Sequence, residues 1–179
     1  MKIAETGIDG LVVIEPRVFN DNRGYFFESF NTQHYQLPYA HQFVQDNEAK
    51  SDKGVLRGLH LQKGVFGQGK LVRVVKGSVF DVAVDLRSGS ATYGLWFGIE
   101  LSGDNKKQLW IPRGFAHGYL VLEDDTIFSY KCDNYYNKDA ESGVRYDDPQ
   151  IGIKWPEVTT NFIISDKDLL LGSLAQPSL

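Results

Sequence analysis

Apolar residues along this chain recur mainly with a period of two, in short runs separated by Gly, Asn or Asp. In residues 80–86 large apolar side chains alternate with aspartate and alanine, and residues 95–101 repeat the pattern. A period of two places one side of a strand against a core. Further strands are predicted at residues 11–14, 24–30, 70–75, 108–111, 119–122 and 126–130.

Helical patterns are few: residues 31–37 and 166–171 predict two short helical turns. Many short strands with turn residues between them are typical of an antiparallel sandwich or barrel. No linker, repeat or low-complexity tract divides residues 1–179. The pattern therefore predicts one all-β domain built as a jelly roll.

The composition narrows the class of protein. A chain of 179 residues with 42% hydrophobic and 23% charged residues is ordinary for one globular domain. Its net charge of −4 argues against binding of a nucleic acid polymer, which needs a basic surface. The single cysteine, Cys132, allows no intrachain disulfide, and neither a signal peptide nor an apolar run of bilayer length is visible. We expect a cytoplasmic protein without a membrane segment.

Two segments have the spacing of a known barrel family. In the first, Gly54 is followed after five residues by His60-Leu61-Gln62, then by Lys70 and Gly77. The second, at residues 112–117, reads Pro-Arg-Gly-Phe-Ala-His. Together they resemble the two cupin motifs, which read Gly-x₅-His-x-His followed by Glu-x₆-Gly, and Pro-x-Gly-x-x-His. Cupins are jelly-roll barrels, so the resemblance implies the same fold as the strand pattern.

The departures from the cupin motifs concern the metal. Metal-binding cupins use three His and one Glu, but here Gln62 replaces the second His and Lys70 replaces the Glu. A lysine is a cation at neutral pH and repels a divalent ion. We therefore expect no metal site. An ammonium group at this place can still stabilise an oxyanion, which is one task of a catalytic metal.

The remaining polar residues of the motifs form a candidate site. Taken singly, His60 or His117 is more often a hydrogen-bonded interior histidine than a catalytic one. An imidazole, the Lys70 ammonium and the Arg57 guanidinium together in one barrel indicate a ligand site, because an apolar core does not accommodate them. The imidazole could act as a base, the ammonium could stabilise an oxyanion, and the guanidinium could bind a phosphate. Tyr130 is a plausible general acid, although a tyrosine in a strand is usually a packing residue.

An ordered series of segments over nearly the whole chain resembles the dTDP-4-dehydrorhamnose 3,5-epimerase family. These segments are residues 21–28, 43–47, 54–60, 70–74, 81–87, 108–118 and 165–168. The resemblance implies an isomerase that converts dTDP-4-dehydro-6-deoxy-D-glucose into dTDP-4-dehydro-L-rhamnose, by epimerisation at C3 and C5. The hydrogens on C3 and C5 are both adjacent to the C4 ketone. Their removal requires a base and a cation near the ketone oxygen, and inversion also requires an acid that returns a proton. No redox cofactor or metal is implied.

The resemblance also implies a role for each residue. His60 would be the base with Asp168 as its carboxylate partner, Lys70 would stabilise the enolate, and Tyr130 would be the acid on the opposite face. Alternatively, Asp168 has only a structural role and caps a turn at the surface. The implied binding residues are Arg57, His117 and Lys167 at the diphosphate or sugar, Gln45, Asn47 and Glu141 at the nucleotide, and Tyr136 stacked on the thymine. Asp46 is also implied to bind substrate, and Arg23, Phe26 and Glu28 are implied to reach a neighbouring subunit.

That last group implies a homodimer, with the N-terminal segment pairing with the other subunit. Alternatively, Arg23 and Glu28 form a surface ion pair. A mono-epimerase or a ketoisomerase acting on a related dTDP-4-keto-6-deoxy sugar remains an alternative function. A metal-dependent cupin is disfavoured by Gln62 and Lys70. A carbohydrate-binding jelly roll without activity is also disfavoured, because simple binding needs no base, cation and acid together.

Overall fold

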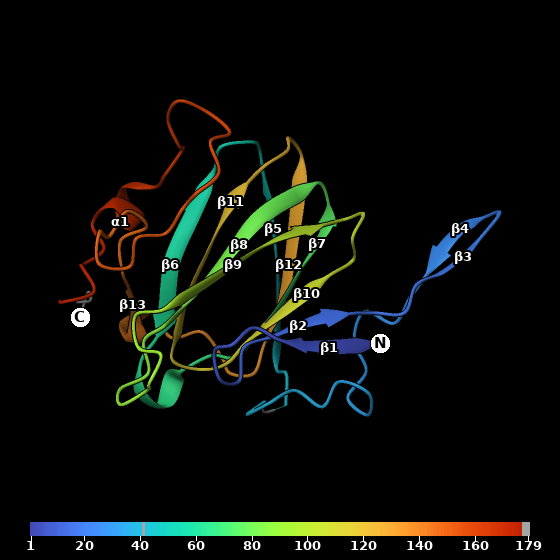
Figure 1. The fold of residues 1–179 in the computed structure, drawn as a ribbon, viewed down its shortest axis with the longest axis horizontal. Coiled ribbons are helices and arrows are strands. Elements are labelled where there is room, and N and C mark those ends of the chain that lie inside the picture. Colours follow the sequence, from blue (N-terminus) through green and yellow to red (C-terminus); the bar gives the residue numbers. More distant parts are fainter. Residues whose placement is uncertain (41, 177–179) are drawn as a thin grey trace.

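The computed structural model describes residues 1–40 and 42–176, which form two antiparallel sheets packed against each other (Figure 1). In spatial order the six-stranded sheet comprises β1 (Lys2–Glu5), β2 (Val12–Glu15), β10 (Gln108–Ile111), β7 (Lys70–Lys76), β12 (Thr126–Cys132) and β5 (Gln45–Ser51). The five-stranded sheet comprises β13 (Glu141–Gly143), β6 (Leu56–Gln62), β11 (Phe115–Val121), β8 (Ser78–Asp85) and β9 (Trp96–Ser102). The all-β, cupin-like jelly-roll prediction is confirmed.

The main core lies between the sheets, where alternate residues of facing strands meet. Val72 and Val74 of β7 pack there with Val79 and Ala83 of β8, and Phe128 of β12 closes the layer. Separate apolar clusters cover the outer faces of both sheets. Strand β8 is consequently buried on both of its faces. Its aspartates lie inside the protein and need partners there.

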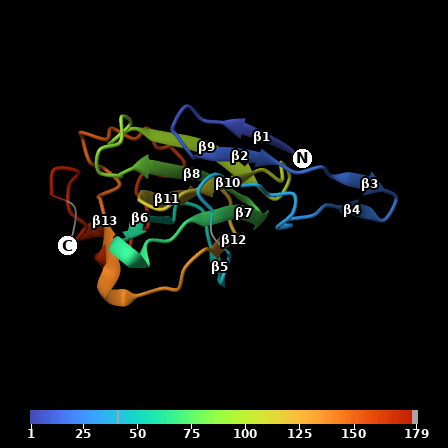
Figure 2. The same cartoon turned by 90° about the horizontal axis from the view of Figure 1, so that it is seen from below.

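A two-stranded hairpin, β3 (Phe19–Asp21) and β4 (Gly24–Phe26), projects from the body at the end opposite to α1 (Asp166–Leu169). In the rotated view the hairpin again projects away from the sheets, at the end opposite to β13 (Figure 2). The hairpin exposes about half or more of the side chains of Phe19, Tyr25 and Phe26, at 49%, 56% and 66%. Such a concentration of exposed aromatic surface is typical of a protein contact.

Some predicted elements differ from the observed ones. Residues 31–37 contain a turn in which the His34 and Tyr35 N–H groups donate to Asn31 O, but no assigned helix, and the strand predicted for 24–30 ends at Phe26. The other helices are short: α1, η1 (Gly64–Phe66) and η2 (Lys138–Ala140). Within the described ranges, no helix is long and apolar enough to cross a membrane.

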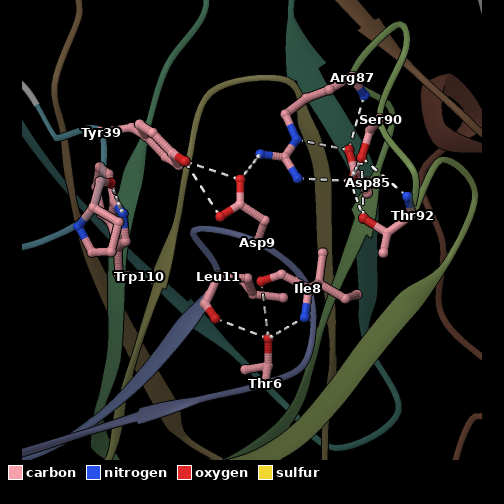
Figure 3. Close-up of polar contacts among 11 residues, drawn as sticks. Thr6, Ile8, Asp9, Leu11, Tyr39, Asp85, Arg87, Ser90, Thr92 and Trp110 are labelled. Atoms are coloured by element: carbon pink, nitrogen blue, oxygen red, sulfur yellow. Dashed lines mark hydrogen bonds and ion pairs between the residues drawn. The ribbon is translucent and has the colours of Figure 1, made fainter.

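A polar network joins the turn between β1 and β2 to the segment after β8 (Figure 3). Asp85 at the end of β8 is fully buried and accepts hydrogen bonds from Arg87, Ser90 and Thr92. Arg87 also lies 3.6 Å from Asp9, which accepts a hydrogen bond from Tyr39. Three segments distant in sequence are thereby tied together by one guanidinium and two carboxylates.

Candidate active site

A cavity of about 560 Å³ opens between the two sheets. It is lined mainly by residues of β5, β6, β7, β11 and β12 and of the segment that leads into α1. Its polar lining includes Arg57, His60, Lys70, His117, Tyr119, Tyr130, Ser165, Lys167 and Asp168. The structure thus brings all four predicted catalytic residues to one cavity.

His60 on β6 is paired with Asp168 on α1. The His60 Nε2 atom lies 2.8 Å from Asp168 Oδ1, and the Gly58 backbone N–H donates to Asp168 Oδ2 at 3.0 Å. The Ser165 hydroxyl caps α1 by accepting from the Asp168 backbone N–H. Both carboxylate oxygens are therefore engaged, and the acid is held in the interior rather than at the surface.

The ionisation of Asp168 fixes the direction of the His60 hydrogen bond. Burial alone would raise the pKa of this carboxyl, but hydrogen bonds from His60 and from the Gly58 N–H outweigh it and lower the pKa below its usual value. A carboxylate only accepts, so Nε2 of His60 carries the hydrogen. The lone pair of a neutral imidazole then lies on Nδ1, which leaves that atom available as a base.

Lys70 and Tyr130 come from the other sheet. In the pairing of β7 with β12, Tyr130 lies opposite Val72 and Cys132 lies opposite Lys70, so Lys70 and Tyr130 are diagonal neighbours. The Lys70 Nζ atom lies 5.9 Å from the centroid of the Tyr130 ring. Burial lowers the pKa of Lys70 and raises the pKa of Tyr130. The cation and the phenol thus face the cavity from the wall opposite to His60.

His117 on β11 is the direct cross-strand neighbour of His60. It is only 6% exposed, and its Nε2 atom lies 2.9 Å from Oδ2 of the fully buried Asp81 on β8. Burial lowers the pKa of His117, although Asp81 opposes the effect. Beside this pair the Arg57 guanidinium is exposed and donates two hydrogen bonds to the Ser51 hydroxyl.

A second hollow of about 310 Å³ shares His60, Lys70 and Tyr130 with the first. It is also lined by the predicted nucleotide residues Gln45, Asn47, Tyr136 and Glu141. The Tyr136 hydroxyl donates to Glu141 at 3.1 Å, and Lys167 forms an ion pair with the same carboxylate. Burial would raise the pKa of Glu141, but these two hydrogen bonds outweigh it and lower the pKa.

Some predicted binding residues lie outside the cavity of this chain. Asp46 is on the opposite face of β5 from its neighbours, pairs with Lys131 at 2.9 Å and does not line either hollow of the site, so its predicted role in substrate binding stays a prediction. The alternation of side chains along a strand is the physical reason for this position. Arg23, Phe26 and Glu28 lie on or just after the projecting hairpin. Arg23 pairs with Asp21, not with Glu28.

The position of Gln62 differs from that of a metal ligand. Its amide is engaged by the backbone of Phe66, Tyr135 and Asn137. Among the residues that the structure describes, no group of three or more His, Cys, Asp or Glu side chains is arranged to hold a metal ion. The Lys70 ammonium lies where the cupin motif has its carboxylate ligand, so the residues present do not form the cupin metal set.

Two polar residues of the first cavity, Ser165 and Tyr119, are not among those that the sequence indicates. A Ser three residues before an acid is nevertheless a recognisable helix N-cap signal, and Ser165 fits it. Tyr119 lines the cavity, and burial raises the pKa of its phenol. No sequence signal distinguishes Tyr119 from a packing residue, because it also stacks on Phe128 at 4.1 Å between ring centroids.

Comparison with known proteins supports one family. Residues 5–176 match the family model described as dTDP-4-dehydrorhamnose 3,5-epimerase. The chain is 51% identical to the Escherichia coli protein of that name, over 97% of this chain and 95% of the relative. It is 49% identical to the Legionella pneumophila enzyme solved in complex with dTDP-4-keto-L-rhamnose, with a TM-score of 0.93 and coverage of 97% and 93% of the two chains.

A more distant neighbour has a narrower specificity. A 3'-monoepimerase from Streptomyces bikiniensis, solved in complex with dTDP-quinovose, is 32% identical, with a TM-score of 0.87 and coverage of 94% of this chain and 86% of that one. The fold alone therefore does not separate a double from a single epimerase. The match of the family model over most of the chain and the 51% identity do identify the group: this chain belongs to the dTDP-4-dehydrorhamnose 3,5-epimerase family.

Proposed function

We propose that this chain epimerises dTDP-4-dehydro-6-deoxy-D-glucose at C3 and C5 to give dTDP-4-dehydro-L-rhamnose. The observation that carries the proposal is the division of the catalytic groups between two walls of one cavity. His60 with Asp168 belongs to the side of the five-stranded sheet, and Lys70 and Tyr130 belong to the six-stranded sheet. Inversion at carbon needs this separation, because the proton leaves one face and returns to the other.

The reaction follows from the placement of these groups. Nδ1 of His60 takes the proton from C3 or C5, and the electron pair of the broken C–H bond moves to the C4 oxygen as an enolate. The Lys70 ammonium stabilises this oxygen. Tyr130 then returns a proton to the carbon from the opposite wall. Asp168 stabilises the imidazolium while the enolate exists, as the third member of a catalytic triad does.

The nucleotide is assigned to the second hollow. Gln45, Asn47, Tyr136 and Glu141 offer amide, phenol and carboxylate groups beside the catalytic residues, as a nucleoside requires. Arg57 and Lys167 supply positive charge at the first cavity, where the diphosphate would lie. These assignments rest on the family resemblance together with the positions of the side chains.

The projecting hairpin supports a homodimer. Arg23, Phe26 and Glu28 line neither hollow of this chain's own site, and the hairpin exposes aromatic side chains. We propose that they complete the nucleotide site of a second copy. The cytoplasm is the proposed location, a proposal that rests on the sequence; the buried free thiol of Cys132 is compatible with it.

The test is incubation of the protein with the substrate in deuterated water, followed by mass spectrometry and proton NMR. The proposed reaction introduces deuterium at both C3 and C5 with inversion at both carbons. A mono-epimerase inverts one carbon only, and a ketoisomerase moves the carbonyl group. Absence of solvent deuterium in the recovered sugar would exclude all three reactions and leave a binding protein.

A further inference from the structure

Gln62, the last residue of β6, uses its whole amide to hold two loops. Its Oε1 atom accepts the Asn137 backbone N–H at 2.6 Å, and its Nε2 atom donates to the carbonyl oxygens of Tyr135 and Phe66 at 3.3 Å and 3.2 Å. The residue is only 6% exposed, so these bonds lie away from bulk water. Loss of one partner leaves a buried polar group unsatisfied.

The segment held by Gln62 contributes Tyr136 and Glu141 to the lining of the second hollow. Tyr136 lies between the two backbone groups that Gln62 binds, and the Tyr136 N–H donates to Gln45 Oε1 at 3.1 Å. Asn137 continues the segment by capping η2, which leads directly into Glu141. Glu141 in turn lies opposite Gln62 in the pairing of β13 with β6. Gln62 thus contacts the segment near both of its ends.

We propose that Gln62 is a positioning residue for nucleotide binding. It orders residues 135–141 before the ligand arrives, so that the Tyr136 ring and the Glu141 carboxylate already line the hollow. The proposal rests on the proposed function, because it takes the second hollow as the nucleotide site. In this chain the position that holds a metal in other cupins serves the binding of a thymidine nucleotide.

The expected effect is on binding rather than on chemistry. If loss of the Gln62 bonds reduces the ordered fraction of residues 135–141 to roughly a tenth, the apparent Kd rises about tenfold. The groups that carry the proton transfers are anchored elsewhere: His60 by Asp168, and Lys70 and Tyr130 by β7 and β12. Turnover at saturating substrate should therefore change little.

The variant Gln62→Met keeps the length of the side chain and removes all three hydrogen bonds. We expect its Kd for dTDP, measured by calorimetry, to rise about tenfold or more, and its kcat to stay within about threefold of the wild-type value. Hydrogen exchange should accelerate in residues 135–141. Gln62→Glu, which keeps the acceptor for Asn137 and loses both donors, should show the same pattern and replaces Gln62→Met if that variant does not fold.

Thr126→Val is the matched control. Thr126 is 1% exposed and its hydroxyl binds a backbone carbonyl, Glu123 O at 2.7 Å, in a turn that contributes nothing to either hollow. It should lose thermal stability to a similar degree while its Kd for dTDP stays at the wild-type value. An unchanged Kd in the Gln62 variants, or an equal rise in the Thr126 variant, would overturn the proposal.

The same experiment separates this proposal from the proposed function. If the wild type binds dTDP more tightly than Gln62→Met but introduces no deuterium into the substrate, the positioning role stands and the epimerase proposal fails. If the wild type binds no dTDP at all, the positioning role fails, whatever the wild type does in deuterated water.

Discussion

At the scale of single residues, His60 and Tyr130 face one cavity from different sheets, so their loss should have different signatures. His60→Ala should stop deuterium exchange at both carbons and lower turnover by about 10²–10⁴-fold, because no base remains. In Tyr130→Phe the base can still remove a proton and return one to the same face. At one carbon at least, Tyr130→Phe should therefore retain more deuterium exchange than inversion.

Mass spectrometry reports the exchange and NMR reports the inversion, so the two effects are separable. Wild-type exchange in His60→Ala would place the base elsewhere. Strictly proportional loss of exchange and inversion in Tyr130→Phe would remove the argument for an acid on the opposite wall.

Lys70 should give the reaction an alkaline limit. Burial lowers the pKa of Lys70, and only its charged form stabilises the enolate, so kcat/KM should decline as the pH rises through this lowered pKa, below the ordinary lysine range. Lys70→Arg should move the decline of its remaining activity to higher pH, because guanidinium stays charged. Lys70→Ala should lose about 10²–10³-fold in kcat at neutral pH. An unchanged alkaline limit in Lys70→Arg would assign it to another group.

The same ammonium predicts independence from metal. A divalent ion in the cupin position would need a carboxylate where Lys70 stands, so activity should survive strong chelators. Elemental analysis and turnover with and without chelator measure this. Stoichiometric bound metal together with activity that a chelator abolishes would contradict it.

The sequence indicates His60 and Lys70 through the spacing of the cupin motifs and Asp168 through a matched segment, whereas the role of Tyr130 rests on the family resemblance and on the acidity of a phenol. Asp46 shows where the assignment of roles by family resemblance reaches its limit. Gln45, Asp46 and Asn47 are consecutive, yet residues in a strand alternate between its faces, so Asp46 points away from the hollow that its two neighbours line. That rule was available from the sequence, but the strand itself was not predicted.

At the scale of elements, the apolar pattern found strands that bury one or both faces, such as β8, β9 and β12. It did not find β5, whose sequence Gln-Asp-Asn-Glu-Ala-Lys-Ser has hardly any apolar residue. This strand is an edge with one face on the cavity and the other toward solvent. A strand that lines a polar site lacks the alternating apolar residues by which a strand is recognised in a sequence.

Strand β8 carries a prediction about stability. Burial would raise the pKa of Asp85, but hydrogen bonds from Arg87, Ser90 and Thr92 outweigh it and lower the pKa (Figure 3). Because the pKa is lower in the folded than in the unfolded state, the carboxylate stabilises the fold at neutral pH, and this contribution is lost as the pH falls through the lowered value. Asp85→Asn should lower the free energy of unfolding by about 3 kcal/mol at neutral pH.

Denaturant unfolding at neutral pH and at about pH 3 measures the effect, and the difference from the wild type should shrink in acid. Asp147→Asn is the control, because Asp147 pairs with Arg145 at the surface, with 41% and 47% of the side chains exposed. Exposed pairs contribute little. Equal losses in the two variants would show that burial of Asp85 gives it no special role.

At the scale of the whole molecule, a shared site predicts complementation. His60→Ala inactivates its own cavity, whereas Phe26→Ala would impair the cavity of its partner. After the two variants are mixed and allowed to exchange subunits, half of the dimers are mixed. Each mixed dimer holds one intact site, so a quarter of all sites become intact and the activity should exceed the mean of the two separate variants by up to about a quarter of the wild-type value.

His60→Ala mixed with Lys70→Ala is the control, because both changes then lie in the cavity of their own chain and no intact site forms. The test is to measure the activity of each mixture as subunit exchange proceeds. Activity that rises only in the mixture of His60→Ala with Phe26→Ala supports the shared site. Full activity of a protein that stays monomeric at assay concentration would rule out the shared site.

The pairing of His60 with Asp168 joins residues 108 positions apart in the chain. Contacts of such long range form late, because the intervening chain must first be ordered. Strands β7 to β13 lie between these two residues, and β1, β2 and β5 precede them, so every strand of both sheets comes before Asp168 in the chain. A refolding molecule can therefore complete both sheets before its base acquires a carboxylate. Recovery of turnover would then lag behind recovery of β-structure. The time course of regained activity would therefore report when the contact between His60 and Asp168 forms during refolding.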